Sequence, residues 1–307
     1  MRTPDMHDIV IIGAGPAGLT AAIYARRAGK TVLLLEKENF GGQITQSPKV
    51  ENYPAFSEIS GNELADRMLE HASALGADIE LDQAAGISKT DSGFSVKGLR
   101  KEYACKAVII ATGSKHRELG LPKEAELVGN GISYCAVCDG AFYAGQKVAV
   151  IGGGNSALQD AVLLSERCKE VVIIQNLAEL TGEKLLQQKL EATENVTIIC
   201  NSVVKSLIGD DQLEAIEITN TVSGESTVID VDGVFVAIGQ KPENEPFADT
   251  VKLDERGYID ANESCRTECD GVFVAGDCRT KSIRQITTAA ADGASAAIAA
   301  CMYIETL

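Results

Sequence analysis

The chain has 307 residues, 45% of which are hydrophobic, and it carries a formal net charge of −16 at pH 7. This length and apolar content allow a full hydrophobic core and suit two domains of ordinary size. The strong negative charge repels phosphodiester backbones and anionic lipid, which argues against nucleic acid and membranes as partners.

We expect neither a targeting signal nor a disulfide framework in this chain. No apolar run approaches the roughly 18 to 20 residues that span a bilayer. The first residues, Met1 to Asp5, lead directly to the short apolar run Ile9–Ile12 and not to a secretory signal. We therefore expect a soluble protein of the cytoplasm. Most of the nine cysteines are expected to be buried thiols. Those that stand alone in apolar or helical stretches are Cys105, Cys168, Cys200 and Cys301.

The first predicted elements form a dinucleotide-binding motif. A buried strand at 9–12 precedes the glycine turn Gly13-Ala-Gly-Pro-Ala-Gly18 and a helix that runs to about Ala28. This spacing of three glycines allows a tight turn and the close approach of a pyrophosphate, which the helix N-terminus attracts. The next strand, 31–35, leads to Glu36, whose carboxylate is placed to accept hydrogen bonds from an adenosine ribose.

Short alternating runs follow and indicate a small antiparallel sheet, at 86–88, 94–97 and 102–104. A separate strand is expected at 107–111, ending in Thr112 and Gly113.

The closely spaced cysteines Cys135-Ala-Val-Cys138 suggest a redox-active dithiol. Half of a zinc site is the alternative, although the chain has only three histidines, and a pair with no role is a third. Asp139 follows directly, and a carboxylate beside a dithiol is placed to relay protons. A helix N-cap is its alternative role.

The opening pattern then repeats without a gap. When Asp8–Glu36 is laid over Lys147–Gln175, the first two glycines of the turn coincide, Ala157 replaces the third glycine, and Gln175 falls on Glu36. An internal repeat of a strand-turn-helix-strand unit predicts a second dinucleotide-binding module in the same polypeptide.

The rest of the chain closes both modules. The second module is expected to end with a strand at 233–239, and another strand leads to Gly276 and Asp277. A helix is predicted from Arg284 to about Tyr303 and is assigned to the first module. We therefore predict an α/β fold in which one Rossmann-like domain, 1–115 plus 245–307, is interrupted by another, 116–244. Cys265, Cys269 and Cys278 are interpreted as structural, with an accessory redox pair as the alternative for Cys265 and Cys269.

Taken together, these motifs resemble the low-molecular-weight thioredoxin reductases of bacteria over nearly the whole chain. The segments that carry the resemblance are Gly13–Gly18, Gly41-Gly-Gln43, Glu51-Asn-Tyr-Pro54, Ala111-Thr-Gly113, Cys135–Asp139, Gly152-Gly-Gly-Asn-Ser-Ala157, Gly276-Asp277 and Arg284-Gln285. The resemblance implies a homodimer in which the interrupted domain holds FAD and the inserted domain holds the dithiol and a nicotinamide site. It also implies that the two domains swing so that the dithiol alternately faces the flavin and the protein substrate.

The resemblance assigns a role to each motif. The residues implied to bind FAD are Gly13, Gly15, Gly18, Glu36, Gly42, Gln43, Asn52, Thr112, Gly113, Asp277, Arg284 and Gln285. Those implied for a nicotinamide nucleotide are Gly152, Gly154, Asn155, Ser156 and Ala157. Cys135, Cys138 and Asp139 are implied to be catalytic, with Cys138 facing the flavin and Cys135 attacking the partner.

The sequence departs from the family at the donor site. Relatives that use NADPH carry His-Arg-Arg and a further arginine after the second strand of the inserted module, where the cations pair with the 2′-phosphate. This chain instead has Gln175-Asn-Leu-Ala-Glu-Leu-Thr-Gly-Glu183. NADPH is therefore disfavoured, because bidentate arginine contacts are the strong ones. NADH and reduced ferredoxin stay open as donors.

Three classes of function remain open from the sequence. The first is a disulfide reductase that passes electrons through FAD and the dithiol to a thioredoxin-like protein. The second is a dithiol oxidase that passes electrons from FAD to oxygen. The third is a flavin-loaded interaction protein with an inactive donor site. The motifs favour the reductase.

Overall fold

The computed structural model describes residues 6–47 and 50–307, so the expectation for Met1 to Asp5 lies outside the described residues. The chain folds into two compact units, which are Met1–Lys115 with Lys241–Leu307 (unit 1) and His116–Gln240 (unit 2). The second boundary lies a little before the expected position at 244. The short strands β7, Ser114–His116, and β16, Gln240–Pro242, pair where the chain crosses between the units.

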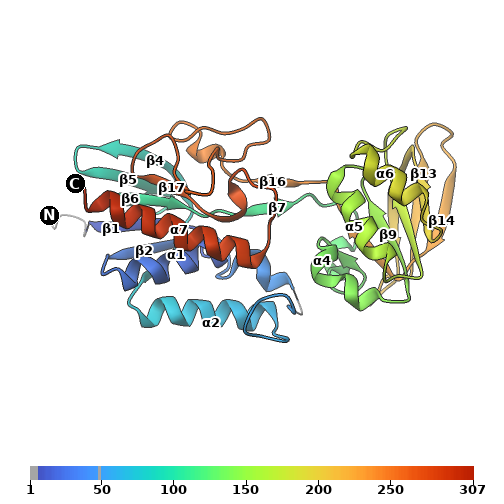
Figure 1. Cartoon of the computed structure of the whole chain (residues 1–307), viewed down its shortest axis with the longest axis horizontal. Helices are drawn as coiled ribbons and strands as arrows, with labels where there is room; N and C mark the ends of the chain where they lie inside the picture. The colour runs from blue at the N-terminus through green and yellow to red at the C-terminus, as the bar shows by residue number, and fades with distance from the viewer. Residues whose placement is uncertain (1–5, 48–49) are drawn as a thin grey trace. The chain divides into compact units, whose positions relative to one another are not determined.

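Unit 1 is built on a seven-stranded sheet that mixes parallel and antiparallel pairs (Figure 1). Ile9 and Ile11 of β1 pack with the helices on one face, while Val10 and Ile12 pack with the second core on the other. Its strands are β1 His7–Ile12, β2 Val32–Glu36, β3 Asp78–Leu81, β4 Ala84–Thr90, β5 Gly93–Gly98, β6 Glu102–Ile110 and β17 Val272–Val274. Its helices are α1 Pro16–Arg27, α2 Gly61–Ala74 and α7 Ile286–Ile304.

The strand order in unit 1 is β3-β2-β1-β6-β5-β4, and β17 also pairs with β6. β6 is one continuous strand, so the expectation of separate strands at 102–104 and 107–111 was wrong. Its first half pairs antiparallel with β5, and its second half pairs parallel with β17. From Cys105 to Ile110, β6 also pairs parallel with β1. A long strand that serves both pairings satisfies more backbone groups than two short strands.

Unit 2 contains a five-stranded parallel sheet in the order β11-β10-β9-β15-β8 and a separate antiparallel sheet, β12-β13-β14. Val148 and Val150 of β9 face the helix α5, whereas Ala149 and Ile151 face the antiparallel sheet. The strands are β8 Ile132–Ser133, β9 Lys147–Ile151, β10 Glu170–Ile174, β11 Val196–Ile199, β12 Ser202–Ile208, β13 Ala215–Asn220, β14 Ser226–Asp230 and β15 Gly233–Val236. The helices are α3 Glu124–Leu127, α4 Ala136–Asp139, α5 Asn155–Ser165 and α6 Lys184–Glu191.

The predicted fold class is confirmed, because each unit contains a parallel strand-turn-helix-strand module. The alanine-rich tail forms α7, which packs against α1 in unit 1 (Figure 1). Small side chains at this contact let the two helices approach closely. Among the described residues, no helix is both long enough and apolar enough to cross a membrane.

Candidate redox and dinucleotide sites

In the glycine turn of unit 1, close packing of the backbone requires glycine at two positions, whereas the third position has room for a side chain. A Cβ on Gly13 would overlap the carbonyl oxygen of Ala111, and a Cβ on Gly18 would overlap that of Gly13. A Cβ on Gly15 would lie 3.9 Å from its nearest neighbour, the carbonyl oxygen of Gly41. Gly15 therefore borders open space at the N-terminus of α1, where free N–H groups attract phosphate.

Glu36 lies where the sequence placed it, at the end of β2, and its side chain is 8% exposed. Its Oε2 accepts a hydrogen bond from the backbone N of Ala14 at 2.8 Å. Its Oε1 accepts from the backbone N of Lys37 at 2.8 Å and of Glu38 at 2.9 Å. A carboxylate has about four acceptor directions, so one remains at Oε2 for a ribose hydroxyl.

Asp277 is a buried carboxylate with an unsatisfied oxygen. It lies in the 3₁₀ turn Gly276–Cys278, and its Oδ1 has no hydrogen-bond partner among the described residues. Burial raises the pKa of Asp277 to about 6, against the lowering effect of Lys281 and Arg284. Buried polar atoms without a partner are rare, so this oxygen indicates a missing hydrogen-bond donor.

The remaining residues implied for FAD all belong to unit 1 and occupy four short segments. Asn52 Nδ2 donates to Gln285 Oε1 at 3.2 Å, while the guanidinium of Arg284 lies 4.3 Å from the centre of the Tyr258 ring. Gly42 and Gln43 begin the 3₁₀ turn Gly42–Gln46. Thr112 Oγ1 donates to Asn244 Oδ1 at 3.0 Å, and a Cβ on Gly113 would meet no atom within 4 Å.

These features together fit an adenine dinucleotide. The turn at Gly15 leaves room for a pyrophosphate, Glu36 keeps one acceptor direction, and Asp277 lacks a donor. A ribityl hydroxyl would supply that donor, and the ribose of adenosine would use Glu36. Unit 1 therefore has the cradle and the polar groups that FAD requires.

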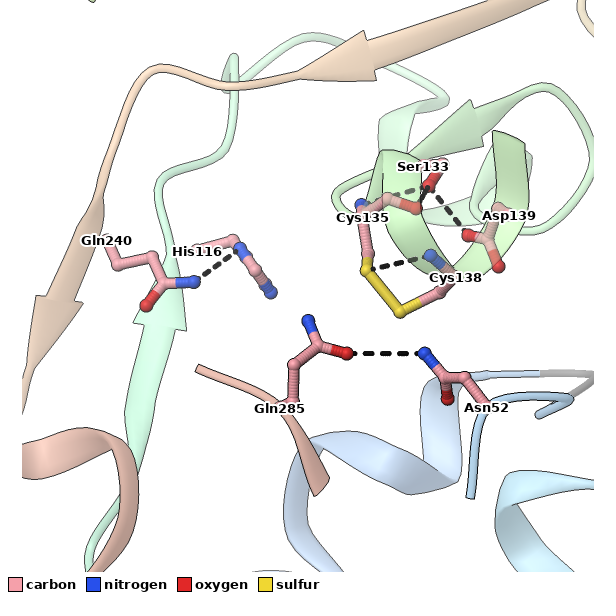
Figure 2. The surroundings of a disulfide bond; sticks show 8 residues. All are labelled: Asn52, His116, Ser133, Cys135, Cys138, Asp139, Gln240 and Gln285. Carbon is pink, nitrogen blue, oxygen red and sulfur yellow. Dashed lines mark hydrogen bonds between the residues drawn. A yellow bond between two sulfur atoms is a disulfide. The ribbon is translucent and has the colours of Figure 1, made fainter. Parts of the chain in front are cut away.

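In unit 2, Cys135 and Cys138 form a disulfide with Cα atoms 5.3 Å apart (Figure 2). Cys138 lies in the short helix α4, and Cys135 is the N-cap of that helix. The Sγ of Cys135 accepts a hydrogen bond from the backbone N of Cys138 at 3.2 Å. The helix N-terminus thus points at the sulfur of Cys135, a placement that stabilises a thiolate when the disulfide opens.

Asp139 is the acidic group beside this disulfide. Its Oδ2 accepts a hydrogen bond from Ser133 Oγ at 2.6 Å, and its buried Oδ1 has no partner among the described residues (Figure 2). Burial raises the pKa of Asp139, and the Ser133 hydrogen bond lowers it in part. Asp139 also occupies the N-cap position of the 3₁₀ turn Gly140–Tyr143, but its side chain makes no capping hydrogen bond there, so the alternative role of a capping side chain was wrong.

Sequence reasoning missed the side chains that hold this segment. Ser133 Oγ also accepts from the backbone N of Cys135 at 3.0 Å. The ring of Tyr134 stacks on His116 with centroids 5.2 Å apart, and its hydroxyl donates to Glu124 Oε1 at 2.9 Å. Desolvation lowers the pKa of His116. The residues before Cys135 are thus anchored on both sides, which no local motif indicated.

The second glycine turn has the same design as the first. A Cβ on Gly152 would overlap the carbonyl oxygen of Ala237, whereas one on Gly154 would lie 3.9 Å from Thr181 Oγ1. Asn155, Ser156 and Ala157 begin α5 directly after it. The open position at Gly154 is therefore retained at the helix N-terminus.

The segment that follows β10 differs from its counterpart in unit 1. Gln175 is 4% exposed, and its Nε2 donates to the carbonyl oxygen of Glu179 at 3.3 Å. A Cβ on Gly153 would overlap the same amide nitrogen, so Gln175 packs flat against the glycine turn. The backbone N of Glu183 donates to Asn155 Oδ1 at 2.7 Å. The loop therefore presents neutral and acidic groups beside the turn.

The other cysteines are free thiols. Burial raises the pKa of both Cys265 and Cys269, which argues against a reactive thiolate at either. Cys278 is buried next to Asp277, as expected. Cys200 is only half-buried and is an exception to the expectation that most cysteines are buried, because it directly follows β11, which lies at the edge of its sheet.

Comparison with known proteins places these sites in context. Residues 7–293 match the family model described as pyridine nucleotide-disulphide oxidoreductase. The chain is 44% identical over 307 residues to the 34.2 kDa protein in rubredoxin operon of Clostridium pasteurianum, with 99% of each chain covered. It is 40% identical to the thioredoxin reductase of Bacillus subtilis, covering 100% of this chain and 98% of the relative. The crystal structure of thioredoxin reductase from Streptococcus pyogenes MGAS5005 matches with a TM-score of 0.94 and 38% identity, covering 99% of this chain and 100% of the other.

Proposed function

Because the chain belongs to the pyridine nucleotide-disulphide oxidoreductase family, we propose that it is an FAD-dependent reductase of a thioredoxin-like protein. The observation that carries this proposal is the disulfide between Cys135 and Cys138 beside the buried, half-satisfied carboxylate of Asp139. The Bacillus subtilis relative and the Streptococcus pyogenes structure both carry the name thioredoxin reductase. The test measures whether the purified protein reduces oxidised thioredoxin when an electron donor is supplied.

The chain's own residues account for the steps at sulfur. FAD, when bound in unit 1, would supply the two electrons that open the disulfide. Cys135 then attacks the partner disulfide, a mixed disulfide forms, and Cys138 resolves it, which regenerates the original pair and releases the partner as a dithiol. Asp139 gives one proton to the departing sulfur and takes one back as the pair closes. Burial raises the pKa of Asp139, which favours the protonated form that this transfer uses.

The surface beside the dithiol supports a protein as the substrate. Val137, between the two cysteines, is 56% exposed, and Phe142 in the next turn is 38% exposed. Apolar side chains exposed around a reactive pair offer contact area that a small disulfide does not need. We propose that these two side chains contact the thioredoxin-like partner.

The FAD assignment leads to a prediction at Gly15. Gly15→Val is expected to fold, because the position borders open space, but to weaken FAD binding about 10- to 100-fold through overlap with the pyrophosphate. Flavin fluorescence titration of the apoprotein measures this. The matched control is Gly154→Val, the same position in the second module, which should leave FAD affinity unchanged. Equal affinity in Gly15→Val and the wild type would remove FAD from this turn.

The donor is proposed to be NADH or an electron-transfer protein such as ferredoxin, with NADPH disfavoured. The support is the loop after β10, where Gln175 is buried, Leu177 is 50% exposed, and no arginine occurs between Gln175 and Glu183. The free thiols outside the dithiol suit a reducing compartment, and we propose the cytoplasm.

We also propose that the protein is a homodimer. A groove of about 470 Å³ in unit 1 is lined by α1, α2 and α7, with Tyr24 and Ala294 on its walls. Ile298, which is 48% exposed, lies one turn beyond Ala294 on the same face of α7. Light scattering is expected to give twice the chain mass of 32.4 kDa, and Ile298→Glu is expected to give the monomer. A monomeric wild-type protein would contradict this.

A further inference from the structure

A buried cluster of charges joins the turn that carries Asp277 to the helix α7. Arg279 is 1% exposed and Asp292 is 4% exposed. Arg279 donates to both oxygens of Asp292, from Nε to Oδ2 at 2.9 Å and from Nη2 to Oδ1 at 2.8 Å. Lys281, whose side chain is 6% exposed, donates from Nζ to Oδ2 at 2.8 Å. Two cations therefore share one buried carboxylate.

This cluster fixes the backbone on either side of Asp277. The backbone N of Gly276 donates to Asp292 Oδ2 at 3.0 Å. Gly276 adopts a φ of 80°, in the left-handed region that favours glycine, and Asp277 follows it directly. On the other side, Arg279 Nη1 donates to the carbonyl oxygen of Thr280 at 3.0 Å. Asp292 thus holds the residue before Asp277, and Arg279 holds those after it.

Stability alone does not account for the cluster. A buried ion pair contributes little net stability, because desolvation offsets most of the attraction between the charges. The cluster also carries an excess positive charge, since Glu263, which Arg279 contacts at 3.2 Å, has a side chain that is 91% exposed. The buried carboxylate that balances this excess is Asp277, whose Oδ1 has no partner among the described residues.

We propose that Lys281, with Arg279 and Asp292, positions Asp277 and supplies the positive charge that keeps its carboxylate a hydrogen-bond acceptor for the ribityl chain of the flavin. Lys281 is then a positioning residue that acts through Asp277. The inference rests on the proposed function, because Asp277 is assigned to FAD there. The inference adds that the number of cationic side chains beside Asp277 determines the pH range in which FAD binds.

The charges around Asp277 give the sign of the effect. Burial raises the pKa of Asp277 most strongly, and the charge of Asp292 also raises it. Lys281, Arg284 and Arg279 lower it, and the resulting pKa is about 6. FAD affinity of the apoprotein should therefore fall as the pH falls through about 6. Without Lys281 the pKa rises further, so the loss of affinity begins at a higher pH.

The experiment compares Lys281→Met with the wild type by flavin fluorescence titration of the apoprotein between pH 5 and 8. We expect the midpoint of the pH dependence to move upward by about one unit in Lys281→Met, with about twofold weaker binding at pH 7 and nearly tenfold weaker binding at about pH 5. Lys281→Arg, which keeps the charge, should restore the wild-type curve. Lys252→Met is the matched control, because Lys252 is an exposed lysine of the same unit that pairs with Asp260.

The outcomes separate this inference from the proposed function. If Lys281→Met folds and gives the same pH curve as Lys252→Met, the inference is overturned. Lys281→Gln serves the same comparison where the methionine variant does not fold. Asp277→Asn tests the assignment of Asp277 to FAD, on which the inference rests. That variant should bind FAD weakly, and its affinity should show no midpoint near pH 6. Wild-type affinity in Asp277→Asn would overturn the proposed role of Asp277 and the inference together.

Discussion

Replacing either Cys135 or Cys138 by serine should lower turnover of a thioredoxin-like disulfide by at least about 10³-fold while FAD stays bound. One cysteine must attack the partner disulfide, and the other must resolve the mixed disulfide. A serine hydroxyl does neither, because its oxygen is a far weaker nucleophile than a thiolate at neutral pH. FAD retention is expected because the dithiol lies in unit 2 and the cradle around Gly15 lies in unit 1. Turnover is measured as reduction of oxidised thioredoxin, and bound flavin by absorbance.

Cys200→Ser is the matched control for these variants. Cys200 is a half-buried free thiol of the same unit, so its replacement changes the thiol content and not the disulfide. Turnover near the wild-type rate is expected. Substantial steady-state activity in both Cys135→Ser and Cys138→Ser would remove the pair from the mechanism. Oxygen consumption with a dithiol and no added donor would instead favour the oxidase.

NADPH is expected to reduce the flavin poorly, and introducing three arginines is expected to strengthen NADPH binding. Asn176 and Leu177 directly follow Gln175, which is buried against Gly153 of the second glycine turn, and Thr181 Oγ1 lies 3.9 Å from the Cβ position of Gly154. Each charge-assisted contact to a 2′-phosphate contributes about 1.5 to 3 kcal/mol, so the absence of two or three weakens NADPH binding by several orders of magnitude. An anaerobic flavin-bleaching test with NADPH, NADH and reduced ferredoxin compares the donors directly.

The gain-of-function variant combines Asn176→Arg, Leu177→Arg and Thr181→Arg. The Thr181 backbone N donates to the carbonyl oxygen of Gly153 at 2.8 Å, and that contact survives any change of side chain. The NADPH concentration for half-maximal bleaching should fall at least about tenfold, and that for NADH should stay the same, because NADH has no 2′-phosphate. Val222→Arg, at a position that is 79% exposed, controls for added positive charge. Rapid wild-type bleaching by micromolar NADPH would show that another cation reads the phosphate.

Several features of the fold and the sites follow from short stretches of sequence. The glycine turns at Gly13 and Gly152 follow buried strands and precede helices, so their local pattern predicted both modules and the class of ligand. The dithiol was equally local, because Cys135 and Cys138 are close in sequence. The acidic loop after β10 was found by laying one module on the other, which needs only the internal repeat.

Other features depended on residues that are distant in sequence. The three glycines of the first turn look alike in the sequence, but only packing against Ala111 and Gly41 shows that Gly13 serves the fold and Gly15 faces open space. The fusion of two expected strands into β6 arose because β17, from the far end of the chain, continues the ladder that β5 begins.

The charged surroundings of the sites were likewise decided by tertiary structure. Asp139 is a buried acid rather than a helix cap because Ser133, on the preceding strand, holds it. Asp277 was recognised from its motif, but Asp292 lies on α7, and no local pattern pairs it with Arg279 and Lys281. Local pattern determined which groups are present, because strand, turn and helix preferences act over a few residues. Burial and charge balance were decided by the fold, because both depend on atoms that only long-range packing brings together.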